Sequence, residues 1–178
     1  MRPGETPGEN MEKGGTAMSE EVERATIVVF SGELDRALAA FNIATTAASM
    51  GMEVTMFFTF WGLNIIKKER GEGGKGNALQ KMMKVMNRGG ARRLHLSRLN
   101  MMGAGTVAMK KLMKTSRMPS LEEMIPMAKE LGVRFIACTT SMGLMGLEED
   151  DFIPEVDEYA GAATYVGKAA ESKINLFI

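Results

Sequence analysis

The chain has one cysteine, one histidine and one tryptophan among its 178 residues. A single cysteine excludes an intrachain disulfide framework and a metal site built from cysteine alone. A lone thiol suits a reducing compartment, and we expect the protein to be cytoplasmic. Lysine plus arginine equals aspartate plus glutamate, at 22 each, so the composition lacks the electrostatic footprint of a nucleic-acid binder.

Long hydrophobic runs are also missing. The most apolar run, residues 54–66, is too short to span a bilayer, which needs about 20 residues. Residues 1–23 are polar and glycine-rich without the apolar core of a signal peptide, so we expect a disordered tail or a cloning remnant. Residues 24–178 suit a single domain with a proper core. The sequence therefore predicts no membrane span.

Continuous apolar runs rich in β-branched residues predict strands that are covered on both faces, and hence a parallel sheet. Such strands are expected at residues 25–30, 54–60, 133–137 and, at the C-terminus, 174–178. A helix is expected over residues 33–50, because Leu34, Leu38 and Phe41 recur at helical spacing. The resulting β–α–β unit requires a right-handed crossover, so the fold class is α/β.

The second half of the chain predicts further helices. Ser120 and Glu123 form a capping-box pattern, and the helix that they start should be kinked or begin later because of Pro126. Other helices are expected over residues 77–87, 106–115 and 159–171. Residues 92–97 fit either a short strand or an irregular connection.

The most informative stretch is residues 133–147, in which five strand-forming residues lead into Cys138. A cysteine at the carboxyl end of a buried strand faces the first free N–H groups of the next segment, and these favour the thiolate. Cys138 is therefore the candidate reactive group. Its candidate anion-stabilising partners are the residues that follow it, Thr139, Thr140, Ser141 and Met142.

Other strand ends should lie at the same edge of a parallel sheet. Ser31 and Gly32 follow the first strand, and Trp61 follows the second, where it either walls the site or caps the core. His95 is the only histidine, and a lone histidine is more often a structural or surface residue than a base. It remains a weak candidate partner for Cys138.

Two glycine-rich stretches invite nucleotide-binding interpretations that their context rejects. Residues 71–76, expected to be a mobile loop, lack the spacing of a phosphate loop, and no strand precedes them. Residues 103–108 fit a relaxed dinucleotide fingerprint, but no clear strand precedes that turn.

The 18 methionines raise the alternative of Cu(I) binding, although their helical spacing favours packing. We predict neither a metal site nor a cofactor.

Several segments together resemble the DsrE/DsrF-like family, and above all its Met-rich branch, which is often labelled peroxiredoxin-like. The segments are residues 29–41, 51–64, 100–103, 137–142 with 145–146, and 175–178. The resemblance covers about residues 25–178. It implies a flavodoxin-like three-layer α/β/α sandwich with a mostly parallel sheet of about five strands, and a homo-oligomer.

The resemblance also implies a function for the cysteine. In such proteins a cysteine at this strand end accepts sulfane sulfur as a persulfide and exchanges it with carriers of the TusA type or with rhodaneses. Cys138 matches that position, and Ser31, Gly32 and Trp61 match the neighbouring strand ends. The leading hypothesis is a sulfur-trafficking protein, a sulfurtransferase or persulfide carrier.

Three alternatives remain open. Free cysteine packs well as a small hydrophobe, so Cys138 could be purely structural. A thiol peroxidase would need a tuned pocket, which residues 135–137 ahead of the cysteine do not indicate, and an external thiol to resolve the oxidised sulfur. The third alternative is a non-catalytic subunit that binds a small anion at the sheet edge.

Overall fold

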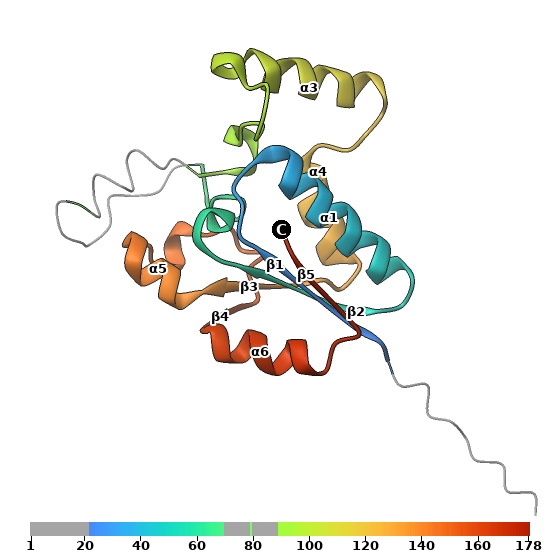
Figure 1. Ribbon diagram of the computed structural model, residues 1–178, viewed down its shortest axis with the longest axis vertical. Coiled ribbons are helices and arrows are strands. Elements are labelled where there is room, and N and C mark those ends of the chain that lie inside the picture. Colours follow the sequence, from blue (N-terminus) through green and yellow to red (C-terminus); the bar gives the residue numbers. More distant parts are fainter. Residues whose placement is uncertain (1–21, 70–78, 80–88) are drawn as a thin grey trace, which may run out of the picture.

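The computed structural model describes residues 22–69, 79 and 89–178 (Figure 1). Its centre is one sheet in which every pairing is parallel, with the strand order β4-β3-β2-β1-β5. The strands are β1 (Arg24–Val29), β2 (Glu53–Phe58), β3 (Arg134–Cys138), β4 (Glu158–Ala160) and β5 (Ile174–Phe177). Helices α1 and α4 lie together on one face and α6 lies on the other (Figure 1). The predicted three-layer α/β/α arrangement is confirmed.

The central strands are buried because both of their faces are covered. After an exposed first residue, β1 and β2 are buried without a break, as their continuous apolar sequences predict. Alternate residues serve different cores. Met56, Phe58 and Phe135 belong to the larger core, whereas Phe57 and Ile136 belong to a smaller cluster on the opposite face.

The larger core lies under α1 (Leu34–Ser49) and α4 (Leu121–Glu130). Phe41 of α1 is fully buried, and its ring lies 5.7 Å from that of Phe135 in an edge-on arrangement. Helix α1 ends at Ser49, and Gly51, two residues later, has a φ of +86°, in the left-handed region that stops helices. Burial of this face is therefore the main source of the fold's stability.

The opposite face is covered more thinly, by α6 (Ala162–Ala170), which has no fully buried residue. The ring of Tyr165 on this helix lies 5.3 Å from that of Phe57 on β2. Val166 and Phe177 on this side are 60% and 70% exposed. The sheet is thus asymmetric, with a thick core on the α1 face and a small cluster under α6.

The remaining elements connect the strands. After β2 comes the 3₁₀ helix η1 (Phe60–Asn64), and η2 (Ala91–Arg93) and η3 (Met101–Gly103) precede helix α3 (Ala104–Thr115). After β3 come α5 (Thr139–Met145) and η4 (Glu149–Asp151). Helix α3 stands away from the sheet at the top of Figure 1. No helix in the described part of the chain has both the length and the apolarity needed to cross a membrane.

Several predicted boundaries are wrong. Residues 159–160 belong to β4, not to the last helix, because Ala137 and Cys138 of β3 pair with them. Residue 60 starts η1 instead of ending β2. Pro126 does not delay α4, which begins at Leu121 behind an intact capping box. Of the two possibilities left open for residues 92–97, the irregular connection is the one confirmed, and it begins with a 3₁₀ turn. The predictions for residues 1–21, 71–76 and, apart from the helical residue 79, 77–87 lie outside the described residues.

Candidate functional site

Cys138 is the last residue of β3 and the residue that precedes helix α5. Its backbone is still extended, with φ −73° and ψ 110°, so the chain turns directly from strand into helix at the cysteine. The strand-end position predicted from the sequence is confirmed. The thiol is free, with no disulfide.

Hydrogen-bond donors converge on the Cys138 sulfur. Burial raises the pKa of this thiol, but the N–H and hydroxyl of Ser141, the Thr59 hydroxyl and the Thr140 N–H donate hydrogen bonds that together lower the pKa below its ordinary value. The two hydroxyls also hydrogen-bond to each other, with 2.8 Å between Thr59 Oγ1 and Ser141 Oγ, so their two protons are shared between this bond and the sulfur. The environment therefore favours a thiolate, the nucleophilic form of cysteine.

Cys138 is nevertheless buried, with 4% of the residue exposed. It belongs to the small cluster with Phe57 and Ile136, against which Ala160 of β4 and Tyr165 of α6 pack. A reagent or partner must therefore approach through the edge of the cluster, where Thr139 and Thr140 are exposed. The hydrogen bonds therefore favour the thiolate of Cys138, while the surrounding side chains restrict access to its sulfur.

The four residues after the cysteine divide into two groups. Ser141 is 2% exposed and reaches the sulfur with both its N–H and its hydroxyl, and Thr140 reaches it with its N–H alone. Met142 is 6% exposed and packs in the larger core. Thr139 is exposed. Ser141 is thus the most direct of the predicted partners.

Sequence reasoning missed Thr59. The register of β2 and β3 pairs Phe58 with Ala137, so the residue after Phe58 lies beside Cys138. The predicted strand 54–60 extends two residues beyond the observed end of β2 at Phe58. Aligning its end with that of residues 133–137 therefore places Trp61, not Thr59, next to Cys138.

Ser31, Gly32 and Trp61 gather in a separate cavity of about 380 Å³. His95, Arg36 and Arg93 also line it, whereas Cys138 and the residues of α5 do not. His95 is tied to this side of the sheet, because its carbonyl accepts a hydrogen bond of 2.8 Å from the Leu34 N–H at the start of α1. The predicted site residues therefore share one sheet edge but form two distinct centres.

The chain crosses closely where β1 and β2 end. A Cβ on Gly62 would lie 1.9 Å from the Val29 carbonyl oxygen, and one on Gly32 would lie 2.6 Å from that of Trp61. Phe60 adopts φ +46°, which is unfavourable for a bulky residue and turns the chain sharply after Thr59. This crossing fixes Thr59 beside α5 and places Trp61, 42% exposed, at the cavity rim.

The described ranges contain no cluster of three His, Cys, Asp or Glu side chains that could hold a metal ion. Among the methionines, Met101 and Met102 are 74% and 105% exposed, whereas Met113 and Met142 pack in the larger core. Buried methionines thus fill core space as their helical spacing predicts.

Comparisons with known proteins agree with this architecture. The chain is 44% identical to the uncharacterized protein YrkE of Bacillus subtilis (strain 168). The matched 161 residues cover 90% of this chain and 100% of YrkE. It is 37% identical over 160 residues to the sulfur carrier protein DsrE2 of Allochromatium vinosum, covering 89% of this chain and 99% of that protein. The crystal structure of the E. coli ychN protein shares the fold, with a TM-score of 0.52 at 10% identity over 88% of this chain and 100% of that one.

A profile of the DsrE/DsrF/DrsH-like family matches residues 21–177. This match includes every strand and helix described above. The resemblance stated from the sequence is confirmed, and the chain belongs to the DsrE/DsrF/DrsH-like family.

Proposed function

We propose that this protein carries sulfane sulfur on Cys138 and exchanges it with thiols of partner proteins. The observation that carries the proposal is the convergence of Ser141, Thr59 and Thr140 on a thiol at a strand end, which lowers its pKa. The proposal is supported by the family match and by 37% identity to a protein named as a sulfur carrier. A sulfur-related role follows at the coarser level, and persulfide exchange at Cys138 is the specific proposal.

The chemistry is an exchange without net oxidation. The Cys138 thiolate attacks the terminal sulfur of a donor persulfide, R–S–SH. A bond forms between Cys138 Sγ and that sulfur, the donor S–S bond breaks, and the donor leaves as the thiolate RS⁻. An acceptor thiolate later takes the terminal sulfur from the Cys138 persulfide by the same reaction and releases the Cys138 thiolate.

The site residues have separable roles in this scheme. The Ser141 N–H and hydroxyl and the Thr59 hydroxyl hold the negative charge on Cys138 before attack and after release. The small cluster of Phe57 and Ile136 keeps water from the far side of the sulfur. Because Cys138 is 4% exposed, exchange also requires a movement at the α5–α6 edge when the partner docks.

The test is intact mass spectrometry of the full chain after incubation with polysulfide, followed by alkylation. We expect one additional sulfur in the wild type and none in Cys138→Ser, because the chain has no other thiol. Transfer of that sulfur to an acceptor thiol should return the mass to its starting value. A native Cys138 that neither gains sulfur nor reacts with an alkylating reagent, although it reacts after unfolding, would make the cysteine a structural residue.

Carriers of the TusA type and rhodaneses are the candidate exchange partners that family membership suggests. They can be tested as donors and acceptors in the same mass assay, with a persulfidated carrier in place of polysulfide. A carrier whose own reactive cysteine is replaced by serine is the matched control.

We also propose that the protein is a homo-oligomer associated through the thinly covered face. The rings of Phe30 and Phe177 stack there at 5.6 Å, and Phe177 is 70% exposed. Light scattering should give a mass above that of one chain for the wild type and a smaller mass for Phe177→Ser. A monomeric wild type would overturn this proposal and leave the sulfur proposal standing.

A further inference from the structure

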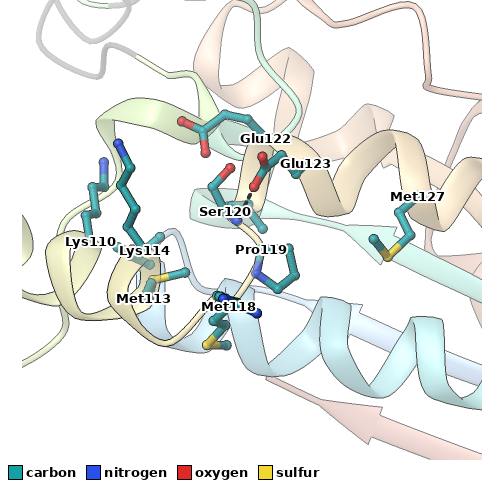
Figure 2. Close-up of a pocket in the computed structure, with 12 residues that line it drawn as sticks. Lys110, Met113, Lys114, Met118, Pro119, Ser120, Glu122, Glu123 and Met127 are labelled. Carbon is teal, nitrogen blue, oxygen red and sulfur yellow. Dashed lines mark hydrogen bonds between the residues drawn. The ribbon is translucent and has the colours of Figure 1, made fainter.

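A pocket of about 790 Å³ lies between α3 and α4 (Figure 2), and Cys138 is not among the residues that line it. Its apolar lining includes Leu121, which is 1% exposed, and Met113, which is 7% exposed. Met118 and Met127, also in the lining, are each 42% exposed. Methionine side chains are flexible and polarisable, so such a lining adapts to different apolar side chains. The pocket is thus suited to apolar anchors of an incoming segment.

The two walls of the pocket differ in charge. Lys110 and Lys114 lie on α3, and Glu122 and Glu123 lie in the first turn of α4 (Figure 2). Arg117, just after α3, also lines the pocket. The two carboxylates are already engaged within the chain. Glu122 forms an ion pair with Arg92 at 3.5 Å, and Glu123 accepts a hydrogen bond of 2.8 Å from the Ser120 N–H in the capping box.

The lysines and the arginine that line the pocket do not form ion pairs with carboxylates in the described part of the chain. Among the described residues, no carboxylate oxygen lies within 4.0 Å of the charged nitrogens of Lys110, Lys114 or Arg117, and Lys110 instead donates to the Arg92 carbonyl at 2.6 Å. The surrounding sequence adds to this imbalance, because residues 91–121 contain no aspartate or glutamate. Their lysines and arginines are Arg92, Arg93, Arg98, Lys110, Lys111, Lys114 and Arg117.

The net charge of the whole chain is zero, so this segment is a local concentration of positive charge in a neutral protein. A positive wall beside an apolar floor attracts a ligand with the opposite arrangement, carboxylates beside apolar side chains. We propose that the α3–α4 pocket docks an acidic amphipathic segment of a partner protein. A concave pocket with cations along one wall favours such a segment over a flat membrane surface.

The proposal does not depend on the chemistry of Cys138. The thiol lies in the cluster under α6, whereas the pocket is lined by residues of α3, α4 and the start of α1. The Cys138→Ser variant should therefore bind the segment as well as the wild type does. Loss of sulfur loading and loss of docking are distinguishable outcomes.

The experiment uses fluorescence anisotropy of the full chain with two labelled synthetic helical peptides. Both carry leucines on one face, and the other face carries glutamates in the acidic probe and lysines in the basic probe. We expect the acidic probe to bind about tenfold or more tightly than the basic probe, with an affinity that falls as NaCl rises from about 50 to 300 mM.

Two sets of variants locate the binding. Replacing Lys110, Lys114 and Arg117 by glutamine should weaken binding of the acidic probe about fivefold or more. Replacing Arg93, Arg98 and Lys111 by glutamine removes the same charge from the same segment outside this pocket, and should change binding less than about twofold. Met118→Ser with Met127→Ser should weaken both probes, because the apolar anchors lose their contacts.

Equal binding of the two probes, or equal losses in the two glutamine variants, would overturn the proposal. So would binding of phosphatidylglycerol vesicles that the acidic probe does not compete with, because the occupant would then be a membrane. A change in molar mass by light scattering in the pocket variants would assign the pocket to a second copy of the chain and would also overturn it.

Discussion

The Thr59 hydroxyl lies 2.8 Å from the Ser141 hydroxyl, and both are within hydrogen-bonding reach of the Cys138 sulfur, so their two protons are shared between the sulfur and the contact between the hydroxyls. Thr59 follows β2 and Ser141 lies in the first turn of α5, so two segments separated by 82 residues meet at one thiol. Neither residue is charged. The pKa of the cysteine is therefore lowered by neutral dipoles, which keep their effect at any pH at which the protein is folded.

Removing the Ser141 hydroxyl should slow the reaction of Cys138. In Ser141→Ala the thiolate loses a hydrogen bond, so we expect the pKa of Cys138 to rise and the alkylation rate at pH 7 to fall roughly threefold to tenfold. The measurement is the pH profile of iodoacetamide alkylation followed by intact mass. Thr140→Ala is the matched control, because only the backbone N–H of Thr140 reaches the sulfur. Equal profiles for all three proteins would contradict the assigned role of Ser141.

The lowered pKa of Cys138 also predicts how stability depends on pH. The pKa of the Cys138 thiol in the folded chain lies below its ordinary value of 9.0, so between these two pKa values the unfolded state binds more protons. Relative to Cys138→Ala, the free energy of unfolding of the wild type should rise with pH through this window. The added stability is complete above the ordinary pKa of 9.0 and is lost as pH falls through the folded pKa. Urea unfolding at several pH values measures the difference, and a decline across the window would mean that burial dominates.

The crossing of β1 and β2 predicts a sharp difference between two glycines. Gly62→Ala places a Cβ 1.9 Å from the Val29 carbonyl oxygen, which the backbone cannot accommodate without moving. We expect this change to lower the free energy of unfolding by about 2 kcal/mol or more. Gly167→Ala, in the middle of α6 with nothing within 4 Å of its Cβ, should instead raise it by about 0.5–1 kcal/mol. Urea unfolding of both variants is the measurement, and similar losses in both would show that the crossing is not tightly packed.

The buried strands were predictable because burial on both faces requires an unbroken run of apolar residues in the sequence. β1, β2 and β3 lie inside a parallel sheet, so both faces need apolar side chains and the runs are continuous. β4 carries no such signal, since Glu158, Tyr159 and Ala160 are only partly buried at the sheet edge. Its conformation is set by pairing with β3 and by Asp157, whose N–H donates to the Phe135 carbonyl and whose carboxylate accepts from the Phe135 N–H. A strand that depends on its neighbour cannot be seen in its own sequence.

The sequence predicted which residues lie at the strand ends, but not on which face of the sheet each of their side chains lies. A parallel sheet places Ser31, Trp61 and Cys138 at one edge, and the structure confirms this. Which face each side chain takes depends on register, and Cys138 shares a face with Phe57 and Ile136 under α6. Ser31 and Trp61 instead line the cavity with His95, whose carbonyl holds the start of α1. Register and loop path, which a single sequence does not specify, separate the two centres.

Tyr165 is expected to control access to the thiol. Its ring packs on Phe57 at 5.3 Å, and the residue contacts the cluster that contains Cys138. In Tyr165→Ala the cover is truncated while the donors on Ser141 and Thr59 remain. Alkylation should therefore become faster, and more so for a bulky maleimide than for iodoacetamide, with no change in the pH midpoint. Val166→Ala, a neighbouring residue on α6 that is 60% exposed, is the control and should react as the wild type does. If Tyr165→Ala shifts the pH midpoint but not the dependence on reagent size, the ring influences the electrostatics of the thiol and does not gate it.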